Sequence, residues 1–409
     1  MNLQLTTHHK KLVADITISG SKSESNRLLI LQQLFPSIKI ENLSDSDDSK
    51  HLEYALSTEE PVINIGHAGT AMRFLTAFFA MQKNKEVILT GSERMQNRPI
   101  EILVNALQDL GAAISYEAKV GYPPIKIKGK ELQKSIVQIQ GNVSSQYISA
   151  LLLVAASLKD GLQIELLGEI TSIPYINMSL SLLKEVGVEA QFIGNKIQVY
   201  PKKEVAKKTI IVESDWSSAS YFYSLIALSE MGSEITLTAY KKESLQGDSC
   251  LERIYKHFGV TTVFTNNGIR LKKEEAPKVS ELNENLKNAP DIAQTIAVTC
   301  FGLGISCNLS GLHTLKIKET DRLEALKEEL TKLGADIQVT NETLHLKKNR
   351  EMKANISIAT YNDHRMAMAF APLALKKKIT ILNAEVVTKS YRAFWNDMKK
   401  IGIEIKELK

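Results

Sequence analysis

The feature that most constrains the fold is a glycine that ends a predicted amphipathic helix in each of five stretches of similar length. These glycines are Gly111, Gly187, Gly259, Gly334 and Gly402, and successive ones lie 76, 72, 75 and 68 residues apart. Glycine suits the left-handed conformation that ends many helices. After each glycine, an alternating run, a turn and a second run predict a β-hairpin, as in residues 335–346. With a less distinct first copy around residues 47–65, the sequence predicts about six helix-plus-hairpin units and an α/β fold.

The composition narrows the class of protein. A chain of 409 residues with 44% hydrophobic and 24% charged residues can form more than one globular domain. The net charge of +5 comes from scattered lysines, which argues against a nucleic-acid-binding groove. The three cysteines lack metal-ligand spacing, which excludes an obvious zinc site or disulfide framework. Without a signal pattern or a long apolar run, we expect a cytoplasmic protein.

Residues 20–27 place cations where a helix is predicted to begin. Ser21 and Glu24 have the spacing of a capping box, and an apolar run follows Arg27. The N-terminus of a helix carries partial positive charge, so Lys22 and Arg27 are unfavourable there unless an anion offsets them. A bound phosphate or carboxylate would do so.

Similar openings recur along the chain. Small, hydroxyl or basic residues precede predicted helices at residues 69–73, 144–146, 217–220 and 363–365. Helix capping explains each serine by itself. Their recurrence at comparable points of a repeat suggests helix N-termini that converge on one anionic ligand.

Residues 318–322 bring two cations and a carboxylate to one side of a predicted helix. Lys318 and Arg322 are four residues apart and repel each other unless an anion lies between them, and Glu319 shares their side. A surface ion-pair network is the alternative interpretation. Arginine is scarce, with ten residues against 41 lysines, so the position of Arg98 is informative. It precedes Pro99, which fits the first position of a helix.

Taken in order, these motifs resemble the 5-enolpyruvylshikimate-3-phosphate synthase family, also called 3-phosphoshikimate 1-carboxyvinyltransferases. The matching segments are residues 20–27, 68–73, 94–100, 144–146, 245–248, 290–291, 318–322, 363–368 and 389–390. Each segment is a weak signal, but the ordered set is specific, and the resemblance runs nearly end to end.

The resemblance implies a fold and a reaction. The fold has two domains, each built of three βαβαββ repeats, with residues 1–20 and 213–409 in one domain and 21–212 in the other. The active site lies in the interdomain cleft. The enzyme transfers the enolpyruvyl group of phosphoenolpyruvate to the 5-hydroxyl of shikimate 3-phosphate and releases phosphate, on the way to chorismate and the aromatic amino acids. It uses no metal or organic cofactor, and we expect a monomer that binds neither nucleic acid nor membrane.

The resemblance also assigns ligand-binding residues. The residues implied for shikimate 3-phosphate are Lys22, Ser23, Arg27, Ser144, Ser145, Gln146, Ser172, Tyr175, Asp291, Thr314 and Lys318. Those implied for phosphoenolpyruvate are Lys22, Gly69, Arg98, Gln146, Arg322, Arg365 and Lys389. The planar guanidinium group of arginine suits this task because it binds carboxylate or phosphate with two parallel hydrogen bonds.

The catalytic residues implied are Asp291, Glu319 and Lys22. Asp291 is placed to take the proton of the 5-hydroxyl, and either Glu319 or Lys22 to handle the proton at C3 of phosphoenolpyruvate. A carboxylate among cations normally has a lowered pKa, so an acid role for Glu319 requires opposing burial.

The sequence departs from the family pattern at His67, where many relatives have Asn, and at Phe74, where some have Pro. These positions bear on sensitivity to the analogue glyphosate. One alternative function is enolpyruvyl transfer to UDP-N-acetylglucosamine, but Glu93 stands where that family has a reactive cysteine. A second is a non-catalytic phosphoanion-binding protein, although such a protein would gain nothing from Asp291 and Glu319.

Overall fold

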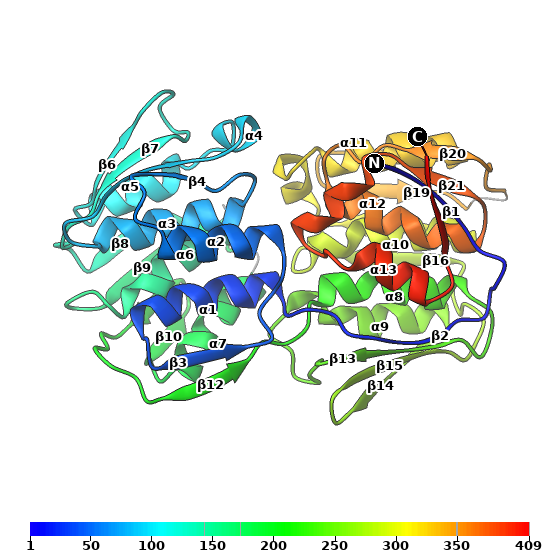
Figure 1. Ribbon diagram of the computed structural model, residues 1–409, viewed down its shortest axis with the longest axis horizontal. Helices are drawn as coiled ribbons and strands as arrows, with labels where there is room; N and C mark the ends of the chain where they lie inside the picture. The colour runs from blue at the N-terminus through cyan, green and yellow to red at the C-terminus, as the bar shows by residue number, and fades with distance from the viewer. Residues whose placement is uncertain (143, 172, 349–350, 409) are drawn as a thin grey trace. The chain divides into compact units, whose positions relative to one another are not determined.

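The structure is a computed structural model that describes residues 1–142, 144–171, 173–348 and 351–408. The chain forms two compact units (Figure 1). Unit 1 contains Met1–Ser19 and Glu213–Lys409, and unit 2 contains Gly20–Val212. The chain therefore passes from one unit to the other twice.

The described residues of unit 1 form three four-stranded sheets with one plan, in which two parallel strands are continued by two antiparallel strands. The first is β2 (Val13–Ile16), β13 (Glu234–Thr238), β15 (Gly268–Lys273) and β14 (Val260–Thr265). The second is β16 (Glu281–Asn285), β17 (Ser306–Ser310), β19 (Leu344–Leu346) and β18 (Ile337–Val339). The third is β20 (Ile356–Ile358), β21 (Ile379–Ile381), β1 (Asn2–Thr6) and β22 (Glu404–Leu408).

Unit 2 follows this plan in two of its three sheets. These are β4 (Val62–Asn64), β5 (Glu86–Thr90), β7 (Ile125–Lys128) and β6 (Ala113–Tyr116), and β8 (Ile136–Gln140), β9 (Leu162–Leu167), β11 (Lys196–Val199) and β10 (Ala190–Ile193). In the described residues the third sheet is only the parallel pair β12 (Lys208–Ile211) and β3 (Ile38–Glu41), because the chain runs from the next helix directly into β4 without a hairpin.

Each repeat supplies two helices of different character. The first helix of each repeat is buried along most of its length: α1 (Lys22–Leu34), α3 (Gly69–Met81), α6 (Ser145–Ala155), α8 (Trp216–Leu228), α10 (Ala293–Leu303) and α12 (His364–Phe370). The second helix buries one face: α2 (Asp47–Ser57), α5 (Glu101–Asp109), α7 (Ile173–Glu185), α9 (Leu251–Tyr255), α11 (Arg322–Leu333) and α13 (Phe394–Lys400). A helix that is apolar all round belongs in a core, but α1 also buries the polar residues Glu24, Ser25, Asn26 and Arg27.

The short helices lie in the connections. They are α4 (Glu93–Gln96) and the 3-10 turns η1 (Gly247–Cys250), η2 (Lys256–Phe258), η3 (Pro290–Ile292), η4 (His313–Ile317), η5 (Ala371–Leu375) and η6 (Ala384–Lys389).

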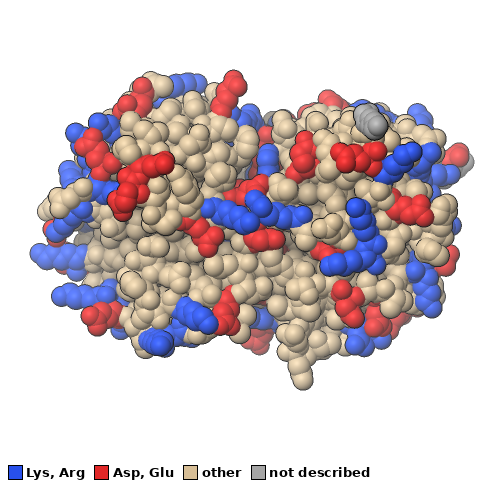
Figure 2. Space-filling view, in the orientation of Figure 1, with Lys and Arg blue, Asp and Glu red and all other residues tan. Residues whose placement is uncertain are grey.

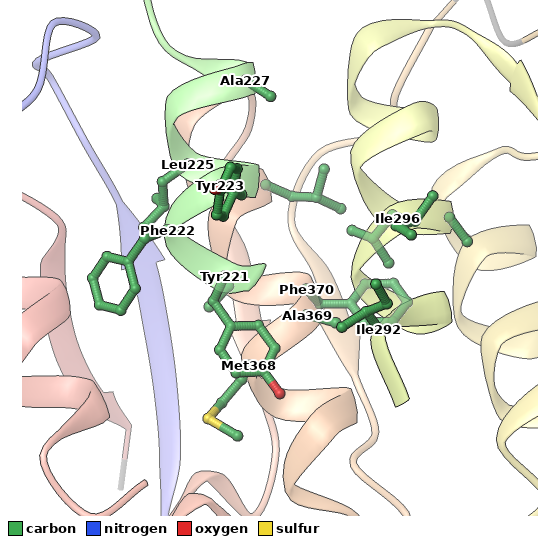
Figure 3. Packing of buried hydrophobic residues seen from close by; sticks show 14 of the residues in the cluster. Tyr221, Phe222, Tyr223, Leu225, Ala227, Ile292, Ile296, Met368, Ala369 and Phe370 are labelled. Atoms are coloured by element: carbon green, nitrogen blue, oxygen red, sulfur yellow. The ribbon is translucent and has the colours of Figure 1, made fainter. Parts of the chain in front are cut away.

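The core of unit 1 lies among its three buried helices. Figure 3 shows Tyr221 and Tyr223 of α8 beside Ile296 of α10 and Phe370 of α12. All four side chains are buried. Close packing of this kind fixes where each helix begins, and the candidate functional residues lie at these helix starts.

The glycine repeat read from the sequence is confirmed. Gly111, Gly187, Gly259, Gly334 and Gly402 all have positive φ, between 76° and 107°, and each follows the second helix of its repeat. The copy around residues 47–65 lacks such a glycine, which agrees with the missing hairpin after α2. The mixed α/β fold expected from the repeat is therefore what the chain adopts.

Two local predictions were wrong. Ser21 is the N-cap of α1, but its hydroxyl does not cap the helix and is buried, with no hydrogen-bond partner among the described residues. Pro99 is not the first residue of a helix, because α5 begins at Glu101 after Ile100. In both cases tertiary packing overrides a local sequence rule. It decides where the Ser21 hydroxyl lies and at which residue α5 begins.

Charged residues of both signs are mixed on the face shown in Figure 2. This agrees with the scattered lysines of the sequence. Among the described residues, no helix combines the length and the apolar character needed to cross a membrane.

Candidate active site

Most of the candidate residues lie at or just before the starts of helices in both units. In an open sheet with parallel strands, helices begin at the carboxyl ends of the strands, and ligands bind at that edge. Repetition of one βα plan therefore gathers helix starts within each unit.

Arg322 is the centre of the site residues in unit 1. It is the first residue of α11, and its side chain is only 2% exposed. Its Nε lies 2.6 Å from Oδ2 of Asp363, Nη1 lies 2.8 Å from Oδ1 of Asp291, and Nη2 lies 2.8 Å from Oε2 of Glu319. Burial alone would lower the pKa of Arg322, but these three carboxylates outweigh it and raise the pKa. The guanidinium is therefore a fixed cation.

Three cationic side chains lie within 4 Å of the Asp291 carboxylate. Besides Arg322, Arg365 Nη2 lies 3.1 Å from its Oδ2, and Lys318 Nζ lies 3.7 Å from its Oδ1. Burial raises the pKa of the Asp291 carboxyl, but Arg365, Lys318 and Arg322 together hold it well below its usual range. Asp291 is therefore ionised in the protein without ligands. We call Asp291, Lys318, Glu319, Arg322, Asp363 and Arg365 the ion-pair cluster of unit 1.

The prediction that Lys318 and Glu319 lie on one side of a helix with Arg322 was wrong, because α11 begins only at Arg322. The ion-pair cluster nevertheless explains the like-charge pair seen in the sequence. Asp291, from η3, lies between Lys318 and Arg322 and supplies the anion that the pair requires. Asp291 favours the charged form of Lys318, yet burial and the neighbouring Arg322 lower the pKa of this lysine overall. The alternative of a surface network is wrong, because Arg322 and Asp363 are almost fully buried.

Two more predicted residues of unit 1, Lys389 and Thr314, contact segments next to the ion-pair cluster. Lys389, the last residue of η6, donates from Nζ to the carbonyl oxygen of Asn362 at 2.6 Å, directly before Asp363. Thr314 lies in η4, which packs against η3, and its hydroxyl is buried with no hydrogen-bond partner in the described part of the chain.

In unit 2, Arg27 joins four helices. Its Nε donates to Ser179 Oγ at 2.8 Å, Nη2 donates to Ser149 Oγ at 2.9 Å, and Nη1 donates to the carbonyl oxygen of Ser23 at 2.7 Å. The guanidinium also lies over the ring of Phe74, 5.5 Å from its centre. Burial lowers the pKa of Arg27 to about 10. The structure thus gives Arg27 a part in aligning α1, α3, α6 and α7.

Lys22 lies in the first turn of α1, where a cation is unfavourable. Asp48, in the first turn of α2, lies 3.6 Å from its Nζ. An anion within the chain therefore offsets part of this charge. The Lys22 side chain remains 20% exposed, so it can also reach a ligand.

Arg98 lies against the start of α3. A Cβ atom on Gly69 would come within 2.4 Å of Arg98 Nη1, so any larger residue would push the guanidinium away from this position. Arg98 is half-buried, and within the described residues no hydrogen bond or ion pair involves its side chain. Arg98 therefore faces the N-terminus of α3, and no carboxylate of the described residues pairs with it.

The loop that carries Arg98 is held at Pro99. Arg73 Nη2 and the hydroxyl of Tyr147 both donate to the Pro99 carbonyl oxygen, at 2.8 and 2.7 Å. Burial, and then the charge of Arg98, lower the pKa of Arg73 to about 10. We call Lys22, Arg27, Arg73 and Arg98 the basic set of unit 2.

The start of α6 presents several polar groups. Ser144 is its N-cap and accepts from the backbone N–H of Gln146. The Gln146 side chain donates to Thr70 at the start of α3, at 3.2 Å. The hydroxyls of Ser23 and Ser145 are half-buried and make no hydrogen bond within the described residues, so they are available to a ligand.

Tyr175 lies in the first turn of α7. Tyr175 is half-buried, and its carbonyl oxygen accepts from Arg27 at 3.3 Å. Ser172 lies outside the described residues.

The sequence reading missed several residues that hold these groups. They are Asp48, Arg73, Ser149, Ser179, Ser217, Asp248 and Asp363. Most lie within or next to the quoted motifs, so a signal was present. The motifs did not predict the hydrogen-bond or ion-pair partner of each residue.

Comparison with known proteins places this geometry in a family. The EPSP synthase (3-phosphoshikimate 1-carboxyvinyltransferase) profile matches residues 51–398. A 3-phosphoshikimate 1-carboxyvinyltransferase of Bacteroides fragilis (strain YCH46) is 46% identical over 400 residues, which cover 97% of each chain. The protein of the same name from Haemophilus influenzae (strain Rd) is 34% identical, over 95% of this chain and 96% of its own.

Solved structures share the fold. EPSP synthase from Acinetobacter baumannii superposes with a TM-score of 0.80 at 22% identity, covering 99% of this chain and 100% of its own. The enolpyruvyl transferase NikO from Streptomyces tendae gives a TM-score of 0.76 at 13% identity, covering 99% and 98%. Together with the sequence matches, which extend over almost the whole length, these findings show that the chain belongs to the EPSP synthase family.

Proposed function

We propose that the ion-pair cluster of unit 1 and the basic set of unit 2 act on one pair of substrates. As a member of its family, the protein transfers the enolpyruvyl group of phosphoenolpyruvate to the 5-hydroxyl of shikimate 3-phosphate and releases phosphate, a step of aromatic amino acid biosynthesis. We take the two units as the two domains of this enzyme and assign residues of each to the substrates.

The single observation that carries the proposal is the contrast in charge at these helix starts. Arg98 faces the start of α3 with no carboxylate partner among the described residues, whereas Asp291 is fully ionised among three cations. A partly neutralised set of cations favours dianionic substrates. A fixed carboxylate among cations can accept a hydrogen bond from a substrate hydroxyl.

We assign shikimate 3-phosphate to polar groups of unit 2 and to part of unit 1. Its phosphate would bind the serines at the start of α6 and Lys318, and its carboxylate would bind Ser23 and Arg27. In support, the hydroxyls of Ser23 and Ser145 are available. The remaining contacts proposed are Lys22, Gln146, Ser172, Tyr175, Asp291 and Thr314.

We assign phosphoenolpyruvate to arginines of both units. Arg98 would bind it at the start of α3, where Gly69 makes room, and Arg322 and Arg365 would bind it from unit 1. Lys22, Gln146 and Lys389 complete the proposed set. In support, Arg365 Nε is buried and has no hydrogen-bond partner among the described residues.

We assign one proton movement to Asp291 and the other to either Glu319 or Lys22. Asp291 accepts a hydrogen bond from the 5-hydroxyl and takes its proton during attack on C2. Because three cations lower its pKa, it becomes an effective base only after the anionic substrates have drawn some of these cations away. The Glu319 carboxylate lies 2.8 Å from Arg322 Nη2 and is 25% exposed, so a substrate can reach it. Glu319 or Lys22 would handle the proton at C3.

A phosphate-release assay tests the proposal. Phosphate should appear only when phosphoenolpyruvate and shikimate 3-phosphate are both present, and activity should persist in a chelator, since the sequence predicts no metal or cofactor. Equal activity with UDP-N-acetylglucosamine would overturn the substrate assignment. The structure favours the shikimate substrate, because all three cysteines belong to unit 1 and Glu93 begins α4.

We further infer a monomer that works in the cytoplasm and binds no nucleic acid. Cys250, Cys300 and Cys307 are all free, which suits a reducing compartment. The mixing of charges in Figure 2 does not favour a nucleic-acid groove on that face. Light scattering after size exclusion would test the monomer.

A further inference from the structure

Asp248 is a buried carboxyl group that the proposed reaction does not use. It lies in η1, at the start of the second helix of its repeat, and is 3% exposed. Its Oδ2 accepts a hydrogen bond from the Ser217 hydroxyl, whereas Oδ1 is buried with no hydrogen-bond partner in the described residues. Buried polar atoms nearly always have partners, so this oxygen needs an explanation.

Ser217 connects Asp248 to a residue of the ion-pair cluster. Arg365 Nη2 donates to Ser217 Oγ at 3.3 Å and lies 3.1 Å from Oδ2 of Asp291. Arg365 Nη1 donates to the carbonyl oxygen of Asp291 at 3.2 Å. The guanidinium is therefore held by Asp291 through both terminal nitrogens and by Ser217, which donates to Asp248, through Nη2.

The charged groups that face Asp248 come from three elements. Asp291 lies in η3, Arg365 in α12, and Asp215 is the N-cap of α8, while Cys250 belongs to the same turn as Asp248. Burial, followed by the charge of Asp291, raises the pKa of Asp248 to about 7, against the opposing effects of Arg365 and the Ser217 hydrogen bond.

We propose that Asp248 is a positioning residue for the phosphoenolpyruvate anion: through Ser217 it holds the Arg365 guanidinium in place, and its Oδ1 takes up a solvent proton when the anion binds. This inference rests on the proposed function, because it assumes that Arg365 binds phosphoenolpyruvate. A new negative charge on Arg365 disfavours the ionised form of Asp248. The neutral carboxyl still accepts from Ser217, so anion binding and protonation of Asp248 promote each other.

The test measures kcat and KM for phosphoenolpyruvate from pH 6 to 8.5 at saturating shikimate 3-phosphate. Asp248→Asn is neutral and keeps an acceptor oxygen, so it mimics the protonated residue. Between pH 6 and 8.5, the wild-type KM should rise about fivefold more than that of Asp248→Asn, the lower end of typical coupling between sites. The ionisation of the substrates is common to both proteins and cancels in the comparison.

Asp248→Ala and Ser217→Ala test the positioning step. Each removes the hydrogen bond that leads to Arg365 and should raise the KM about fivefold at pH 6, the effect of one lost hydrogen bond. The matched control is Asp336→Asn, an exposed carboxylate of unit 1 that pairs with Lys347 and should behave as the wild type. If Asp248→Ala does not fold, the other two variants decide the result.

The outcomes separate this inference from the proposed function. An Arg365→Lys variant with wild-type KM would overturn both. A raised KM in Arg365→Lys, together with a wild-type pH profile in Asp248→Asn, would overturn the proton uptake alone. A wild-type KM in Ser217→Ala at pH 6 would overturn the positioning role.

Discussion

The two units hold their cations in different ways. In unit 2, Arg27 and Arg73 donate to serine hydroxyls and backbone carbonyl oxygens, and burial lowers the pKa of each to about 10. In unit 1, Arg322 meets three carboxylates, which raise its pKa. The basic set therefore keeps positive charge that a substrate can neutralise, whereas the ion-pair cluster is largely neutralised by the chain itself.

This difference shows how one repeated plan can serve two purposes. The helix starts of unit 2 carry charge that is not fully offset, which suits the binding of phosphate and carboxylate groups. Those of unit 1 carry carboxylates whose basicity is set by neighbouring cations, which suits proton transfer. The variants below test whether binding and chemistry are divided in this way.

The largest effect is expected from the carboxylates of unit 1. Asp291→Asn and Glu319→Gln should each lower kcat by roughly two or more orders of magnitude, the scale of a positioned acid or base. Shikimate 3-phosphate should still bind to Glu319→Gln with nearly unchanged affinity, because this residue is assigned to the C3 proton. Steady-state kinetics and calorimetry measure the two quantities, and near-normal turnover in both variants would remove these residues from the mechanism.

A matched pair of arginine variants compares the two units directly. Arg98→Ala should raise the KM for phosphoenolpyruvate by about tenfold or more, the loss of one charge-assisted contact, with little change in the free energy of unfolding. Arg322→Ala leaves three carboxylates without their shared cation and should lower that free energy by about 3–5 kcal/mol. Urea unfolding and kinetics on both variants decide this. A strongly destabilised Arg98→Ala protein would show that the unit 2 cation is structural as well.

The smallest expected effect is a change with pH in the free energy of unfolding. Asp291 and Asp248 should change it in opposite directions, because the pKa of one is lowered and that of the other is raised. The lowered pKa of Asp291 stabilises the fold above the ordinary value of about 3.9, and this contribution is lost as the pH falls through its folded-state pKa. The deficit of Asp291→Asn relative to wild type should therefore shrink in acid.

The contribution of Asp248 to stability changes with pH in the opposite direction. Because its pKa is raised to about 7, the folded state binds more protons than the unfolded chain above about pH 4, and stability falls as the pH rises toward 7. Asp248→Asn should gain stability relative to wild type between pH 5 and pH 8 in urea unfolding. A constant difference across this range would contradict the raised pKa.

Much of the fold could be predicted from local signals. The five glycines with positive φ, the apolar first helices and the hairpins each depend on a few neighbouring residues, so the repeat was visible in the sequence. The same holds for the residues at the helix starts, because capping, charge and glycine act over one turn. Glu319, three residues before Arg322, lies outside α11 and not in a helix as predicted, but still pairs with Arg322 at 2.8 Å.

The partners of these residues were decided by the tertiary structure. Arg27 bonds to Ser149 and Ser179, 122 and 152 positions away, and Arg322 bonds to Asp363, 41 positions away. Local rules also failed where packing overrode them, as at Ser21, whose hydroxyl is buried instead of capping α1. The sequence by itself determined which groups stand at each helix start. Which cation a carboxylate meets depends on how the repeats pack, because ion pairing is set by distances across elements that no sequence window contains.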